Sequence, residues 1–472
     1  MKLLSISLRN VRLRLLSTAL TTTAIALATG LYAAIMLMVE QTRSRYEGSI
    51  EGYRAIVGAK GSSELELVLN TIFNVGTPRE LVRLRIYEAL RDGRTLGRRT
   101  QLLYVIPQAR GDVFSKYRFP VIGTTDEMWS KFERKGRNLS FAAGRPWAFS
   151  HEELVRLSED LAAHLTAERT GAEVVPARPP LPASWREAVI GSRVARRLGL
   201  SLGDRVVPSH GAPDEIGFHA HEEASCTVVG ILEPTNSPLD SSIFIPLGTY
   251  ALLADHEDKV FVVEIPPGKN PDDAAQMPVE GHDLGLTAII AYPKDHFGPK
   301  FLRDELASRP GAQGAWPQEV VPRFLRQIGN AADVLVAIAW LVLLVAAVLV
   351  LVSIYNTMNE RRREIAIMRS LGARRHQILS IIVGEAALLS ASGAVLGVLA
   401  CHLAALWLGG AVEEMTGVYV DWLAFRIVPW PASEGRELYL VLAVTGLGAL
   451  AGLLPAIKGS MTQVADNLTQ NY

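Results

Sequence analysis

The hydrophobic positions gather in four long runs, one near the beginning of the chain and three in its last third. The most uniform run extends from Val334 to Tyr355 and is long enough to cross a bilayer as a helix. The pattern predicts four membrane-spanning helices, with expected ranges 15–39, 331–357, 378–408 and 438–457. The hydropathy is therefore typical of an integral membrane protein.

The polar stretch between the first two spans, residues 40–330, alternates short strand patterns with helix patterns. Strands are expected at 102–106, 119–122 and 260–265. Two capping boxes predict helix starts, one at Thr77–Glu80 and one at Ser150–Glu153. The second heads a helix with an apolar face formed by Leu154, Leu157, Leu161 and Leu165. We predict a large α+β domain here, built in two lobes.

Arginines mark two parts of the chain that should face the cytoplasm. Residues 1–14 form a predicted amphipathic helix on the membrane surface, and residues 358–377, between the second and third spans, are strongly basic. With these two parts in the cytoplasm, the domain 40–330 and the loop 409–437 should lie on the opposite, outer side of the membrane. The tail 458–472 returns to the cytoplasm.

The basic stretch 358–377, called the coupling segment below, is also predicted to be helical. Ile365, Met368 and Leu371 recur at helical spacing, and Gly372 offers a stop for the helix. A short basic helix with an apolar stripe is suited to docking a partner protein. The alternative is that its arginines only fix topology and contact anionic lipid headgroups.

The sequence ERRREIAIMRSLGA, followed by Glu385 and GAVLG, resembles the permease domain of the MacB/FtsX superfamily. The stretches EAVIGSRVARRLGLSLGDRV and TVVGIL also resemble the extracytoplasmic domain of MacB-like permeases, with a porter-like lobe and an inserted lobe. These proteins are membrane subunits of type VII ABC transporters, a group that includes the lipoprotein-releasing permeases. The resemblance implies a homodimer, or a heterodimer with a related permease, that works with a separate cytosolic ABC ATPase.

The resemblance also implies a role for the coupling segment, which would fit into a cleft of the ATPase. The residues expected to make this contact are Glu360, Arg361, Arg362, Arg363, Glu364, Ile365, Met368, Arg369, Leu371 and Gly372. Motion of the ATPase would then reach the outer domains through the spans.

Several functions are not supported by the sequence. It contains no GxxxxGK[ST] phosphate-binding loop, so ATP and Mg would be bound by the partner and the chain needs no cofactor of its own. The 48 basic and 48 acidic residues balance, which argues against a nucleic-acid binder. With only two cysteines, a disulfide framework is not expected. No grouping of residues suggests catalysis, so the chain itself is not expected to be an enzyme.

Polar and small residues within the predicted spans suggest helix contacts. Glu385 either reaches the membrane interface or pairs with a basic group of the coupling segment or of a neighbouring subunit. Two GxxxG patterns permit close helix approach, either within the chain or at a dimer seam. They are formed by Gly393 with Gly397 and by Gly448 with Gly452.

One cluster in the outer domain has the composition of a metal site. It contains His210, His219, His221, Glu222 and Glu223, and an H-x-H pattern in an extended segment puts both imidazoles on one face. The sequence leaves two interpretations open, a solvated pH-responsive loop and a site for zinc or another transition metal.

The function indicated is a permease in the bacterial cytoplasmic (inner) membrane, with its large domain in the periplasm. Expected substrates are a lipoprotein, a peptide or a small toxic molecule, and a periplasmic or outer-membrane component is a possible further partner. One alternative is a membrane regulator that uses the same motion to activate a cell-wall enzyme. The other is a metal-handling ABC system.

Overall fold

A computed structural model describes residues 15–76, 80–93, 101–213, 217–253, 260–263, 277–295, 298–309, 311–416 and 436–460. Contacts divide the chain into two compact units. Unit 1 comprises Met1–Arg43 and Gln327–Tyr472, and unit 2 comprises Ser44–Arg326. Both divisions fall within long helices, α2 (Leu15–Ser49) and α11 (Pro317–Glu360).

Unit 1 is helical, as the apolar runs predict. Besides parts of α2 and α11 it contains α12 (Arg362–Ser370), α13 (Arg375–Thr416) and α14 (Arg436–Ser460). Four helices are long and apolar enough to cross a membrane, over Thr18–Val39, Asp333–Glu360, Arg375–Gly409 and Glu437–Lys458. Large apolar side chains such as Leu341, Leu344 and Trp407 are exposed on them. Such faces are stable in lipid and unfavourable in water.

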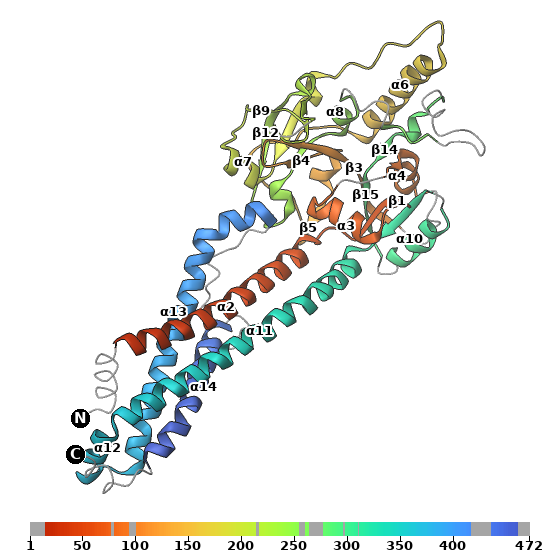
Figure 1. Ribbon diagram of the computed structural model, residues 1–472. Coiled ribbons are helices and arrows are strands. Elements are labelled where there is room, and N and C mark those ends of the chain that lie inside the picture. The colour runs from red at the N-terminus through yellow and green to blue at the C-terminus, as the bar shows by residue number, and fades with distance from the viewer. Residues whose placement is uncertain are drawn as a thin grey trace. The chain divides into compact units, whose positions relative to one another are not determined.

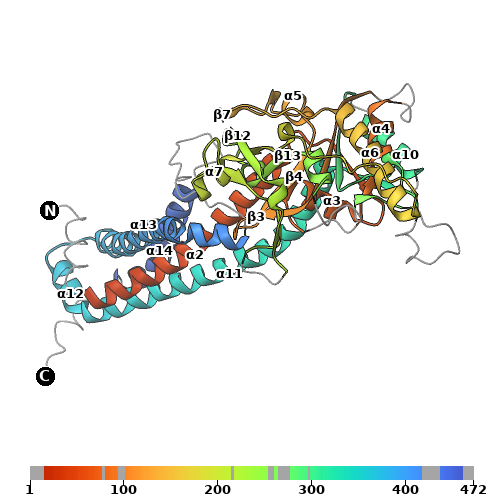
Figure 2. The same ribbon diagram turned by 90° about the horizontal axis from the view of Figure 1, so that it is seen from above.

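Small residues let the helices of unit 1 approach closely. A Cβ atom added at Gly393 would lie 2.7 Å from the Cβ of Ile25, and one at Gly30 would lie 3.0 Å from the carbonyl oxygen of Gly397, so this GxxxG pattern contacts α2. The second pattern, Gly448 with Gly452, faces Ser390 and Ala386 of α13. Figures 1 and 2 show α13 and α14 side by side. Both patterns therefore make contacts within the chain.

Unit 2 is built on a 12-stranded mixed sheet. Its strands are β1 (Ala55–Ala59), β3 (Leu102–Phe114), β4 (Phe119–Thr124), β7 (Phe141–Gly144), β8 (Glu187–Ile190), β9 (Arg205–Val206), β10 (Ser209–His210), β11 (His219–Ala220), β12 (Cys226–Leu232), β13 (Ile243–Pro246), β15 (Ala288–Pro293) and β16 (Ala312–Ala315). The main path runs β16-β1-β15-β3-β4-β13-β8-β12-β7. Two pairs of strands lie outside this sheet, β2 (Val82–Arg83) with β14 (Gly285–Leu286) and β5 (Glu133–Arg134) with β6 (Arg137–Asn138).

Short helices complete unit 2. The α-helices are α3 (Glu64–Phe73), α4 (Leu84–Arg91), α5 (Glu127–Ser130), α6 (His151–Thr170), α7 (Ser192–Leu198), α8 (Leu247–Ala251) and α10 (Gly298–Ala307). The 3-10 turns are η2 (Ala183–Trp185), η3 (Glu222–Ala224), η4 (Pro238–Ser241) and η6 (Gly281–Asp283). Strands and helices enclose one apolar core, in which Trp129 lies edge-on to Trp147 and Phe244 at centroid distances of 5.3 and 5.4 Å.

The capping box at Ser150–Glu153 is confirmed. The Ser150 hydroxyl accepts from the backbone N–H of Glu153, and the Glu153 carboxylate accepts from the N–H of Ser150, at 3.2 and 2.8 Å. The four leucines predicted to share a face of α6 are all buried, as an amphipathic helix on the core requires.

Other local predictions were wrong. Of the helix start expected at Thr77–Glu80, residues 77–79 lie outside the described residues and Glu80 is not helical. The helix begins at Leu84, because Val82 and Arg83 pair with β14. The Glu80 carboxylate accepts from the backbone N–H of Gly61 instead of capping a helix. Of the predicted strand 260–265, the structure describes residues 260–263. These residues form no strand, and Phe261 makes one isolated bridge to Leu284.

Some expectations stay predictions. Strands from both expected lobes join the same sheet, and the two-lobe division of unit 2 is not established by the structure. The amphipathic helix 1–14 and most of the loop 409–437 and of the tail 458–472 lie outside the described residues.

Candidate functional site

The coupling segment forms a tightly connected helix between two membrane helices. α11 ends at Glu360, and α12 begins after the single residue Arg361, whose φ of −103° and ψ of 12° interrupt the helical geometry. α13 begins at Arg375, so α12 is joined to both neighbours by short connections (Figure 1). α12 is therefore joined to α11 through Arg361 alone and to α13 through residues 371–374.

Glycine ends α12 as the sequence predicts. Gly372 has a φ of +96°, a conformation that other residues rarely adopt. Its N–H donates to the carbonyl of Arg369, and the N–H of Ala373 donates to the carbonyl of Met368, both at 3.0 Å. These two bonds form a Schellman motif, which satisfies the last carbonyls of the helix. The predicted stop at Gly372 is confirmed.

The expected apolar stripe of α12 is divided between two faces. Ile365 and Ala366 are buried, and Met368 packs against the same core of unit 1. Leu371 is 83% exposed and Ile367 is 43% exposed. The exposed apolar surface of α12 therefore consists of Ile367 and Leu371, while Ile365 and Met368 pack against the core of unit 1.

The arginines of α12 are divided in the same way. Arg362 and Arg363 are exposed, and the Arg362 guanidinium donates to the side-chain amide oxygen of Asn359 at 2.9 Å. Arg361 points inward with its side chain 19% exposed. The exposed surface is therefore basic at the start of α12 and apolar at its end. Glu360 and Glu364 are exposed beside it, and Arg369 is half-buried.

Glu385 pairs with the coupling segment. It lies on α13 with its side chain 10% exposed, and its Oε2 is 3.7 Å from Nη1 of Arg361. The Arg361 Nε also donates to the Glu364 carboxylate at 3.1 Å. Of the two alternatives for Glu385, the structure favours pairing with a basic group of the coupling segment. The ion pair ties the junction of α11 and α12 to α13.

Basic residues are concentrated where α11 ends and α13 begins, on and around α12. Lys458, near the end of α14, donates to the Tyr355 hydroxyl of α11 at 3.0 Å, close in sequence to the arginines of α12. Toward the other ends of their helices, Trp340, Trp407 and Tyr439 are exposed. Aromatic residues favour membrane interfaces and arginines favour the cytoplasmic side.

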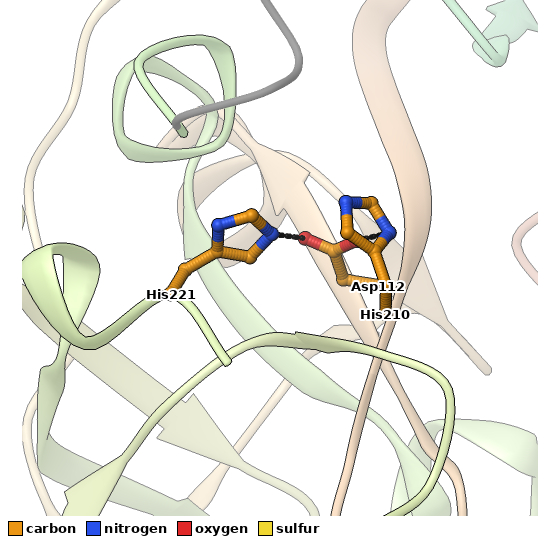
Figure 3. Close-up of side chains that lie close together, drawn as sticks. All are labelled: Asp112, His210 and His221. Atoms are coloured by element: carbon orange, nitrogen blue, oxygen red, sulfur yellow. Dashed lines mark ion pairs between the residues drawn. The ribbon is translucent and has the colours of Figure 1, made fainter. Parts of the chain in front are cut away.

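A second candidate site lies in unit 2, where the structure brings together Asp112, His210 and His221 (Figure 3). His210 Nδ1 is 3.2 Å from Asp112 Oδ1, and His221 Nε2 is 3.9 Å from Asp112 Oδ2. Asp112 and His221 are buried, so the interpretation of the histidines as a solvated loop is wrong for His221. His219 and Glu222 are exposed and are not among the three closest groups.

Asp112 was missed by the sequence analysis. It lies on β3, which continues to Phe114, whereas the hydrophobic pattern predicts a strand only over 102–106. No signal in the sequence marks it, because Gln108, Arg110 and Gly111 interrupt the apolar pattern before Asp112. Cys226 comes after the histidines in the sequence but is not part of this cluster. Its thiol donates to the carbonyl of Ala224, and burial raises the pKa of the thiol to about 12.

Comparison with known proteins gives three matches. Residues 18–277 match the model of the MacB-like periplasmic core domain, and residues 336–464 match that of the FtsX-like permease C-terminal domain. An uncharacterized ABC transporter permease, YvrN of Bacillus subtilis (strain 168), is 36% identical over 112 residues. The aligned part covers 24% of this chain and 24% of the relative.

Proposed function

Because the chain belongs to the MacB/FtsX-like permease family, we propose that it is the permease subunit of a type VII ABC transporter. Hydrolysis of ATP is assigned to a separate cytosolic ATPase. The observation that carries this proposal is α12, a short basic helix between two membrane helices with an exposed apolar end. Among the described residues of unit 1, Ile367 and Leu371 remain exposed and do not join its apolar core.

The proposed contact with the ATPase uses the exposed face of α12. Ile367 and Leu371 would enter an apolar cleft, and Arg362 and Arg363 would meet acidic residues at its rim. Buried apolar anchors supply most of the affinity of an interface, and surrounding charges set its specificity and rate of formation. The complementary partner surface is therefore apolar at its centre and acidic around it.

The proposed action is mechanotransmission. Closure of the ATPase on binding ATP displaces α12, and the one-residue junction at Arg361 passes the displacement to α11. The ion pair with Glu385 passes it to α13. α11 continues to Pro317, within unit 2, so the displacement has a helical route to the outer domain. The substrate need not pass between the membrane helices.

The proposed orientation puts α12 in the cytoplasm and unit 2 in the periplasm. The basic residues on and around α12 support it, because arginines and lysines favour the cytoplasmic side. The protein would act as a homodimer, or paired with a related permease, in the bacterial inner membrane. It would export or extract an extracytoplasmic substrate, with lipoproteins, peptides and small toxic molecules as the candidate classes.

Replacement of Leu371 tests the docking surface. Leu371→Asp is expected to weaken co-purification of the ATPase at least tenfold, because a charge enters an apolar cleft. The unfolding free energy of the chain should change by no more than about 0.5 kcal/mol, since the side chain is 83% exposed.

The matched control is Val174→Asp, at a similarly exposed apolar residue of unit 2. It should leave co-purification unchanged. The assignment of α12 is wrong if Leu371→Asp leaves the amount of recovered ATPase at the wild-type level.

A further inference from the structure

We propose that Asp112, His210 and His221 bind a divalent transition-metal ion, with zinc as the best match. Each residue offers one ligand atom, and these atoms all lie within 4.8 Å of one another. Figure 3 shows both imidazoles directed at the carboxylate, from opposite sides. The site belongs to unit 2 and is independent of the coupling proposed for α12.

The spacing of the donor atoms suits a small ion. Zinc holds nitrogen and oxygen ligands at about 2.0–2.2 Å, so ligand atoms of a tetrahedral site lie roughly 3.4 Å apart. His210 Nδ1 lies 3.2 Å from Asp112 Oδ1 and His221 Nε2 lies 3.9 Å from Asp112 Oδ2, so each contact involves a different oxygen of the carboxylate. Rotation of the side chains would bring one carboxylate oxygen and the two imidazole nitrogens, which lie within 4.8 Å of one another, onto a single ion.

The donor set identifies the class of ion. Two imidazoles and one carboxylate suit zinc and related transition metals, whereas calcium and magnesium prefer sites made of oxygen alone. Three protein ligands leave a fourth position for water or for a further side chain. His219 is one candidate, because its ring centroid is 5.1 Å from that of His221 and it is the register partner of His210 in the β10–β11 pair.

A further carboxylate orients one of the ligands. Glu223 Oε1 lies 3.3 Å from Nδ1 of His221, while Nε2 of the same ring faces Asp112. A carboxylate on the outer nitrogen of a ligating histidine fixes the tautomer and leaves the inner nitrogen free to bind metal. Glu222, a ligand in the sequence prediction, is not among the three closest groups. Its neighbour Glu223 is instead a positioning residue that acts through His221.

The backbone around the site is well fixed. The N–H of His221 donates to the carbonyl of Pro208 at 2.9 Å, and the Ser209 hydroxyl donates to the carbonyl of Val113 on β3 at 3.0 Å. Ser209 also pairs with Val113 in the sheet. A bound ion would therefore join the β10–β11 pair to the central strand β3 and stabilise this part of unit 2.

The test is zinc binding by the full chain, purified in detergent and stripped of metal with a chelator. Calorimetry should show one zinc ion per chain, and cobalt at the same site should give visible absorption bands of a low-symmetry nitrogen and oxygen site. Asp112→Asn and His210→Gln should each lower the affinity at least 100-fold. Glu223→Gln should lower it about tenfold, because it acts through His221.

The matched control is His282→Gln. His282 lies in a second, more exposed group with Glu280 and Asp283, and this variant should bind zinc as the wild type does. His210 is 39% exposed and Glu223 is 48% exposed, so both variants should retain the fold, which circular dichroism checks. The proposal is overturned if the folded wild type binds no zinc. It is also overturned if His282→Gln abolishes binding while Asp112→Asn and His210→Gln preserve it.

Discussion

Reversal of the two exposed arginines, Arg362→Glu with Arg363→Glu, is expected to abolish stimulation of the partner ATPase. Both side chains are exposed on α12, next to the apolar end formed by Ile367 and Leu371. Two carboxylates facing an acidic rim would replace attraction by repulsion, at a cost of about 2–5 kcal/mol. The affinity should then fall about thirtyfold or more.

The measurement is ATP hydrolysis by the ATPase that co-purifies with the wild-type chain, reconstituted with each variant in lipid vesicles. Raised salt should weaken the wild-type complex, because exposed charges are screened. The control, Arg85→Glu with Arg156→Glu, makes the same change in net charge at exposed positions of unit 2 and should preserve stimulation. If the reversed α12 variant stimulates hydrolysis like the wild type, the arginines do not contact the ATPase.

Reversal of the inward-facing arginine, Arg361→Glu, is expected to destabilise the membrane unit itself. The new carboxylate would face Glu364 and Glu385, which contact Arg361 at 3.1 and 3.7 Å. Loss of one partner from a buried ion pair, with a like charge in its place, should cost about 3 kcal/mol. Thermal unfolding in detergent should show a lowered midpoint.

The charge-swapped variant Arg361→Glu with Glu385→Arg separates this effect from a general loss of folding. It should recover a coupling energy of about 1–3 kcal/mol, because opposite charges again face each other. Arg363→Glu, an exposed neighbour, should unfold like the wild type. The single variants Arg361→Glu and Glu385→Arg complete the comparison. If the change in unfolding free energy of the charge-swapped variant equals the sum of their two changes, Arg361 and Glu385 do not interact.

The sequence is most informative where a local pattern decides the structure. Ser150 and Glu153 cap α6 through bonds between residues three positions apart, and Gly372 ends α12 through its own backbone conformation. The apolar runs likewise predict the four membrane helices, because hydropathy alone determines whether a segment of about 20 residues can span a bilayer. No knowledge of the tertiary fold is needed for these features.

The sequence is least informative where distant segments meet. Asp112 joins His210 and His221 only because β10 pairs with β3, and no local pattern encodes this pairing. Helical spacing groups Ile365, Met368 and Leu371, but the packing of α12 buries Ile365, partly buries Met368 and exposes Leu371. The helix start predicted at Thr77–Glu80 is wrong at Glu80 for a related reason. Residues 82–83 pair with the distant strand β14, so the helix begins only at Leu84.

The central claim, that α12 docks on a separate ATPase, is tested most directly by photocrosslinking in native membranes. A photoreactive amino acid would replace Leu371, and a second variant would carry it at Leu344, which is exposed on the membrane-spanning part of α11. Position 371 is predicted to crosslink to a protein with a GxxxxGK[ST] phosphate-binding loop, and position 344 is not. Crosslinks from position 371 to lipid alone would contradict the account and leave the arginines as a topology signal.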